Sequence, residues 1–149
     1  MKNKPILPPT YLFLAIVIML ALHFLCPVAI AIKVPWNIVG LIPLTSGLIL
    51  NLVADRAFKQ QQTTVKPFEM SKALITTGAY RLSRNPMYLG FELILFGIAV
   101  FLGSLTPFAV VLVFPVLMEV VFIKREEVML KQQFGVTWLA YQQKVRRWL

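Results

Sequence analysis

The stretch RLSRNPMYLGFELILFGIAV, residues 81–100, joins a basic, polar segment directly to a long apolar run. Asn is a preferred N-cap residue and Pro is favoured at the first helical position, so Asn85 and Pro86 predict the start of a helix. The seventeen residues from Pro86 to Leu102 contain one charged side chain, Glu92, and are apolar enough to lie in a bilayer. The stretch therefore predicts a membrane helix whose first turn lies at the membrane surface.

The composition extends this prediction to the whole chain. Of its 149 residues, 58% are hydrophobic and 14% are charged, which is typical of an integral membrane protein and leaves no length for a second domain. We therefore predict an all-α, polytopic membrane protein with about four transmembrane helices in a single domain, residues 1–149. The expected spans are about residues 10–32, 36–54, 86–102 and 105–123, the last two forming a tight hairpin. Residues 55–85 form a loop, and the tail, residues 124–149, ends in an amphipathic helix expected on the bilayer surface.

The positive charges predict the orientation of these spans. Of the fifteen Lys and Arg residues, two precede the first span, six lie in the central loop and six follow the fourth span, whereas Lys33 alone lies in a loop on the other side. The positive-inside rule then places both termini and the central loop in the cytoplasm. Because the basic residues are spread over three segments, we expect contact with anionic lipid and no nucleic-acid binding. The single Cys26 excludes an internal disulfide and a Cys-based zinc site, and no metal site is expected.

The helix start at Asn85 is a candidate binding site. The first amides of a helix have no partner within it, and they lie at the positive end of the helix dipole, so they favour a carboxylate or a phosphate. Arg81 and Arg84 stand beside this helix start, and Asn85, Tyr88 and Glu92 share one helical face. The alternative is that Asn85 only caps the helix while the two arginines hold lipid phosphates.

Two acidic residues, Glu92 and Glu119, fall inside or at the edge of the predicted spans. Ionisable groups in a membrane are costly, which makes both of them functional candidates. An interhelical hydrogen bond is the alternative for both, and Glu126 and Glu127 can pair with nearby Lys and Arg side chains. A small transporter would also use intramembrane acids, but the first span holds none. A non-catalytic membrane scaffold is a further alternative.

Two segments carry a family resemblance. TTGAYRLSRNPMYLG, residues 76–90, is followed one hairpin later by REEVMLKQQFGVTWLAYQQKVRRWL, residues 125–149. These segments contain G-x-Y, R-[HN]-P-x-Y-x-G, E-E and F-G-x-x-[YW]-x-x-Y in that order. The chain resembles the isoprenylcysteine carboxyl methyltransferase family in its small bacterial branch, within the wider group of phospholipid methyltransferases. The resemblance covers residues 63–149.

The resemblance implies a membrane methyltransferase that uses S-adenosyl-L-methionine without a Rossmann domain, in the inner membrane of a bacterium, with its site on the cytoplasmic side. The acceptor would be lipophilic or amphipathic. Carried over by position, the cofactor contacts are Lys72, Ala73, Leu74, Ile75, Tyr80, Asn85, Pro86, Met87, Tyr88 and Glu126. The candidates for a catalytic role are Glu127, Arg125 and Glu92.

The chain departs from the eukaryotic members of that family at two positions. Asn85 replaces a His, and Phe122 stands where an Arg is taken to hold the carboxylate of the acceptor, a function for which Lys124 or Arg125 could substitute. Methyl transfer from a sulfonium is an in-line displacement, so it needs alignment of the reacting atoms and exclusion of water. A carboxylate acceptor would need no base, whereas an amine or hydroxyl would need one, for which Glu92, Glu119 or Glu127 are candidates.

Overall fold

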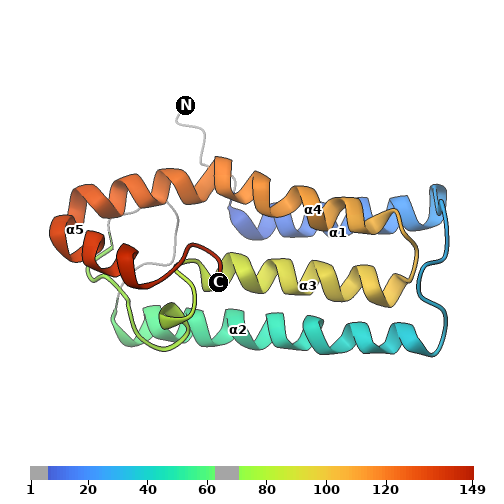
Figure 1. Cartoon of the computed structure of the whole chain (residues 1–149), viewed down its shortest axis with the longest axis horizontal. Coiled ribbons are helices and arrows are strands. Elements are labelled where there is room, and N and C mark those ends of the chain that lie inside the picture. Colours follow the sequence, from blue (N-terminus) through green and yellow to red (C-terminus); the bar gives the residue numbers. More distant parts are fainter. Residues whose placement is uncertain (1–6, 63–70) are drawn as a thin grey trace.

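The computed structural model describes residues 7–62 and 71–149, and this part of the chain is all-helical apart from one isolated bridge between Ile30 and Ser104. The long helices are α1 (Pro8–Leu25), α2 (Leu41–Gln60), α3 (Pro86–Leu102), α4 (Pro107–Met118) and α5 (Lys124–Lys144). The short ones are the 3-10 helices η1 (Trp36–Gly40) and η2 (Gly78–Arg81) and the π-helix η3 (Glu119–Ile123). Figure 1 shows α1 to α4 running along a common axis, with α5 extending beyond the end of this bundle.

The helix bounds agree with some of the predicted segments and differ from others. Within the described residues, Pro8–Leu25 and Trp36–Gln60 are long and apolar enough to cross a membrane, and Pro86–Leu102 is a shorter apolar helix with the predicted bounds. The prediction that the first helix continues to residue 32 is wrong, because α1 ends at Leu25. The cause is local: Pro27 disfavours helical geometry at Cys26, whose φ is −142° and ψ 54°. The second helix continues past residue 54 to Gln60.

Helix α3 lies in the middle of the bundle and packs with both of its faces. Phe91, Leu95 and Ala99 belong to a buried apolar cluster that also contains residues of α1 and α4, such as Met19 and Phe114. The opposite face of α3 lies against α2, with which it makes a closer, glycine-based contact. This double packing fixes the position of the first turn of α3, where the candidate site begins.

The contact between α2 and α3 depends on glycines. A Cβ atom added to Gly97 would lie 2.5 Å from the backbone nitrogen of Leu44 and 2.6 Å from the carbonyl oxygen of Gly40. A Cβ atom added to Gly47 would likewise lie 2.5 Å from the carbonyl oxygen of Gly90. Small residues allow two helix backbones to approach closely, which drives helix association in membranes. A larger side chain at either position would force the helices apart.

Substitution of Gly97 tests this contact. Gly97→Ala is expected to destabilise the protein by about 1–3 kcal/mol, because the added methyl group meets backbone atoms that cannot move independently. Thermal unfolding in detergent measures the loss. Phe101→Leu, on the same helix at a side chain that is 45% exposed, is the control and is expected to change stability by less than about 0.5 kcal/mol. Equal unfolding temperatures for Gly97→Ala and the parent would contradict the packing.

The end of the chain turns back onto the bundle. α4 passes through the π-helix η3 into α5, and within α5 the backbone of Gly135 has φ 51° and ψ −120°, which breaks the helix. The residues after Gly135 return towards the start of α3 (Figure 1). Trp138, Tyr141 and Val145 are buried in a cluster with Leu74. The prediction that these apolar residues lie on the bilayer is therefore wrong, because their partner is protein.

Candidate functional site

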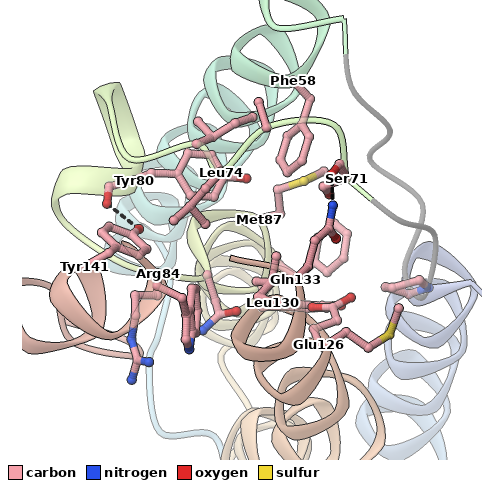
Figure 2. A pocket seen from close by; sticks show the side chains of 18 of the residues that line it. Phe58, Ser71, Leu74, Tyr80, Arg84, Met87, Glu126, Leu130, Gln133 and Tyr141 are labelled. Atoms are coloured by element: carbon pink, nitrogen blue, oxygen red, sulfur yellow. Dashed lines mark hydrogen bonds between the residues drawn. The ribbon is translucent and has the colours of Figure 1, made fainter. Parts of the chain in front are cut away.

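A cavity of about 300 Å³ lies at the end of the bundle where α3 begins. Its walls come from the start of α1, the end of α2, the segment before η2, the first turns of α3, and α5 on both sides of Gly135. Figure 2 shows side chains from these elements converging, with Tyr80, Tyr141 and Leu74 on one side and Glu126 and Gln133 on the other. Segments distant in the sequence therefore meet at one cavity.

Most of the cofactor contacts that the resemblance implies line this cavity. They are Ala73, Leu74, Ile75, Tyr80, Asn85, Met87, Tyr88 and Glu126. The other two do not line it: Lys72 is exposed, and Pro86, the first residue of α3, is fully buried. Residues from four elements are thus brought together at one cavity.

Tyr88 and Glu126 form the central polar contact of the cavity. The Tyr88 hydroxyl donates a hydrogen bond to Oε1 of Glu126 over 3.0 Å, which joins the first turn of α3 to the first turn of α5. Burial disfavours the charged carboxylate and raises the pKa of Glu126 to about 7, although the hydrogen bond from Tyr88 partly opposes this shift. The site therefore holds a carboxyl group that titrates near neutral pH.

Aromatic side chains form a second wall. The Tyr141 hydroxyl donates to the carbonyl oxygen of Tyr80 over 2.6 Å, which ties the returning segment of α5 to η2. Phe58 packs edge-on against Tyr80, with ring centroids 5.6 Å apart, and Trp138 lies next to Tyr141. Burial raises the pKa of Tyr80 above its ordinary value and that of Tyr141 to about 12, so both phenols are neutral. This wall can hold a flat, uncharged ring.

Asn85 occupies the predicted helix start but does not cap it. It precedes the first residue of α3, yet its side chain makes no hydrogen bond to the helix amides. Its amide nitrogen Nδ2 instead donates to the carbonyl oxygen of Arg147 over 3.0 Å, and its backbone N–H donates to Oγ of Ser83 over 3.1 Å. The predicted helix start is confirmed, whereas the predicted capping bond is replaced by an anchor to the end of the chain.

The three candidates for a catalytic role lie outside the cavity lining. Glu127 takes part in ion pairs with Arg147, 2.7 Å away, and with Nη1 of Arg84, 3.1 Å away, although the latter lacks hydrogen-bond geometry. Arg125 is exposed on α5. Glu92 is half-buried on α3, where its Oε2 has no hydrogen-bond partner among the described residues. We conclude that Glu127 belongs to a charged cluster behind the cavity wall.

The position of Phe122 is also resolved. Phe122 is 1% exposed and stacks on Tyr88, with ring centroids 6.1 Å apart, so it supports Tyr88 from the core. Lys124 is exposed, and its ammonium lies 3.7 Å from Glu119, outside the cavity lining. Glu119 also pairs with Arg147 over 2.8 Å. Neither Lys124 nor Arg125 therefore supplies a cation to the cavity at this position.

The prediction missed several residues of the lining. Met129, Leu130 and Gln133 follow Glu126 at the third, fourth and seventh positions, so helical periodicity from Glu126 could have found them. Phe91 likewise follows Tyr88 at the third position, Arg84 stands beside the predicted helix start, and Trp138 and Tyr141 belong to the F-G-x-x-[YW]-x-x-Y motif, although none of them was assigned to the cofactor site. The others offered no such signal, since they come from distant elements. They are Leu7, Pro8, Pro9, Phe58 and Ser71.

Comparison with known proteins identifies this arrangement. The phospholipid methyltransferase family matches residues 36–137, which is more than half of the chain. An uncharacterised protein of Haemophilus influenzae is 40% identical over 63 residues, which are 42% of this chain and the whole of that protein. A eukaryotic intramembrane Ras methyltransferase, isoprenylcysteine carboxyl methyltransferase, superposes with a TM-score of 0.73 at 26% identity.

The superposition covers 95% of this chain and 52% of the eukaryotic enzyme, so this chain spans about half the length of that protein. The matched family residues include both sides of the Tyr88–Glu126 contact. The resemblance predicted from the sequence segments is confirmed. This integral membrane protein belongs to the phospholipid methyltransferase family, with a fold like that of isoprenylcysteine carboxyl methyltransferase.

Proposed function

We propose that the chain transfers a methyl group from S-adenosyl-L-methionine to a lipophilic or amphipathic acceptor at the membrane surface. The observation that carries the proposal is the Tyr88–Glu126 contact, set in the wall of a cavity that is otherwise mainly apolar and aromatic. The similar eukaryotic protein is named as a Ras methyltransferase, and the family is named for phospholipid methylation. Both names are consistent with an acceptor that is attached to, or part of, the membrane.

The residues of the cavity fit this cofactor. Phe58, Tyr80 and Trp138 offer flat rings for the adenine of the cofactor. Glu126 and Asn85 offer oxygen acceptors for the ribose hydroxyls and the ammonium group of the cofactor. When bound, S-adenosylmethionine supplies an electrophilic methyl group on a positively charged sulfur. An ionised Glu126 would favour that charge by Coulomb attraction in a water-poor site.

The protein would contribute alignment and exclusion of water. Tyr88 holds Glu126 in one orientation, and Tyr141 ties the returning end of α5 to η2, which closes one side of the cavity. The start of α1 contributes Pro8 and Pro9 to the opposite side, so we propose that the acceptor arrives between α1 and α5. Within the described residues, Glu126 is the one acidic residue of the lining, so it is our candidate base for an amine or hydroxyl acceptor.

The finer topology is part of this proposal. We place four spans in the inner membrane of a bacterium, with both termini and the cavity on the cytoplasmic side. The charge distribution supports this orientation. Three of the basic residues on which it depends, Lys2, Lys4 and Lys66, lie outside the described residues.

Calorimetry of the detergent-solubilised protein with S-adenosylmethionine tests the proposal. The parent is expected to bind, and Asn85→Ala is expected to bind about tenfold more weakly, because it loses a polar contact and an anchor to the chain end. Leu82→Ala is the matched control, since Leu82 is 69% exposed beside Asn85 and outside the cavity. No binding by a folded parent would overturn the proposal.

The pKa of Glu126 predicts a pH dependence of this binding. In the free protein the pKa is about 7, and a cationic ligand favours the ionised carboxylate and lowers that value. Affinity is therefore expected to be highest above pH 7 and to fall by up to about tenfold per pH unit below it, with a proton released on binding. Calorimetry in buffers of different ionisation enthalpy measures this release. Glu126→Gln is expected to remove the dependence, and a profile unchanged in that variant would contradict it.

A further inference from the structure

The end of the chain fixes the orientation of the Asn85 side chain. The carbonyl oxygen of Arg147 accepts hydrogen bonds from Nδ2 of Asn85, over 3.0 Å, and from Oγ of Ser83, over 3.1 Å. A carbonyl oxygen can only accept, so the nitrogen of the amide must face Arg147 and the oxygen must face away. Turning the amide over would set two oxygens against each other and lose the bond.

Two backbone contacts hold this arrangement in place. The N–H of Arg84 donates to the carbonyl oxygen of Arg146 over 2.9 Å, and the N–H of Asn85 donates to Ser83 Oγ. The tail and the turn before α3 are therefore joined by hydrogen bonds on both sides of Asn85. Oδ1 of Asn85 has no hydrogen-bond partner among the described residues, and Asn85 lines the cavity, so we infer that this oxygen is the atom that a ligand meets.

Apart from Arg84, whose Nε and Nη1 are donors with no hydrogen-bond partner among the described residues, the neighbouring polar groups of the cavity also present acceptors to a ligand. Glu126 uses Oε1 to accept from Tyr88, which leaves Oε2 as a further acceptor. Tyr88, Tyr141 and Gln133 all direct a side-chain donor to protein oxygens, namely to Glu126, to the carbonyl of Tyr80 and to the carbonyl of Ser71. Asn85 and Glu126 thus both offer hydrogen-bond acceptors to a ligand.

We propose that the C-terminal tail makes Asn85 a hydrogen-bond acceptor, so that Asn85 and Glu126 together select a ligand group that donates hydrogen bonds. Such a group is a primary ammonium or a pair of hydroxyls, and not a carboxylate. Arg147 is then a positioning residue that acts through its backbone carbonyl. This inference rests on the proposed function, because S-adenosylmethionine carries both kinds of donor, on its amino-acid end and on its ribose.

Binding of S-adenosylhomocysteine and three of its analogues tests the polarity of Asn85. The analogues lack the amino group, the carboxylate or the two ribose hydroxyls, and calorimetry compares the parent with Asn85→Leu. Asn85→Leu is expected to weaken binding of the complete ligand and of the carboxylate-free analogue by the same factor, about tenfold. It should have no effect on the analogue that lacks the donor in contact with Asn85, which identifies that donor as the amine or the hydroxyls.

Asn85→Asp gives a second, independent comparison that does not depend on the apolar variant. It keeps an oxygen towards the cavity and removes the donor to Arg147, so it should keep the preference for donor-bearing ligands while unfolding at a lower temperature. If the effect of Asn85→Leu vanishes only with the carboxylate-free analogue, or is equal for all four ligands, the inference is overturned. No binding of S-adenosylhomocysteine by the folded parent would overturn the proposed function itself.

Discussion

Glu126→Ala is expected to weaken the binding of S-adenosylmethionine by about ten- to a hundredfold. Hydrogen bonds to a charged group contribute about 1.5–3 kcal/mol each, and a difference of 1.4 kcal/mol is a factor of ten in affinity. The residue is half-buried and its carboxyl is oriented by Tyr88 across 3.0 Å, so water cannot fully replace it. Calorimetry in detergent measures the change above pH 7, where the parent carboxylate is ionised.

Tyr88→Phe separates the orientation of Glu126 from its charge. Removing the hydroxyl keeps the carboxylate but loses the bond that lowers its pKa, so the pKa of Glu126 should rise above about 7. The pH at which binding weakens should therefore move upward, with a smaller loss of affinity at high pH than in Glu126→Ala. Val128→Ala is the control, because Val128 lies on α5 with Glu126 but is 55% exposed and outside the cavity. Normal binding by Glu126→Ala would remove Glu126 from the site.

The sequence predicts those parts of the fold that depend on local signals. Asn85 and Pro86 mark the start of α3 because cap and first-turn preferences are properties of single residues. The bounds of α2 were not predictable in the same way. Hydropathy reports how much of a helix fits in lipid, whereas α2 continues through Asp55 and Lys59, which pair at 2.6 Å, to Gln60. The hydrophobic length of a span and the length of its helix are different quantities.

In the candidate site, too, the residues with a local sequence signal were predicted, and those that depend on contacts between distant segments were not. Tyr80, Asn85, Pro86, Met87, Tyr88 and Glu126 were identified because they lie in the two segments that carry the family resemblance. Trp138 and Tyr141 were expected on the bilayer because an amphipathic pattern shows that an apolar partner exists and does not identify it. Their partner is decided by the backbone of Gly135, whose φ of 51° turns the chain back, and by the bond from Tyr141 to Tyr80. That outcome depends on contacts between distant segments.

Glu127→Ala is expected to destabilise the protein by about 3–5 kcal/mol, because it leaves the buried guanidinium of Arg84 without its counter-charge. The side chains of Arg84 and Glu127 are 8% and 12% exposed, and their closest atoms lie 3.1 Å apart. Arg147 would keep Glu119 as a partner at 2.8 Å, whereas Arg84 has no second acidic partner among the described residues. Thermal unfolding in detergent should show a fall of roughly 10 °C or more.

Three comparisons distinguish a stabilising role of Glu127, as the ion-pair partner of Arg84, from a catalytic role. Asp55→Ala breaks the pair with Lys59, which is 73% exposed, and should cost less than about 1 kcal/mol. Replacing both members of the buried pair, as Arg84→Met with Glu127→Leu, should recover much of the stability, since no unpaired charge remains. Glu127→Ala should reduce methyl transfer only in proportion to the unfolded fraction. If Glu127→Ala instead unfolds at the temperature of the parent and loses methyl transfer, then Glu127 is a catalytic residue, as predicted from the sequence, and its ion pairs with Arg84 and Arg147 serve to orient it.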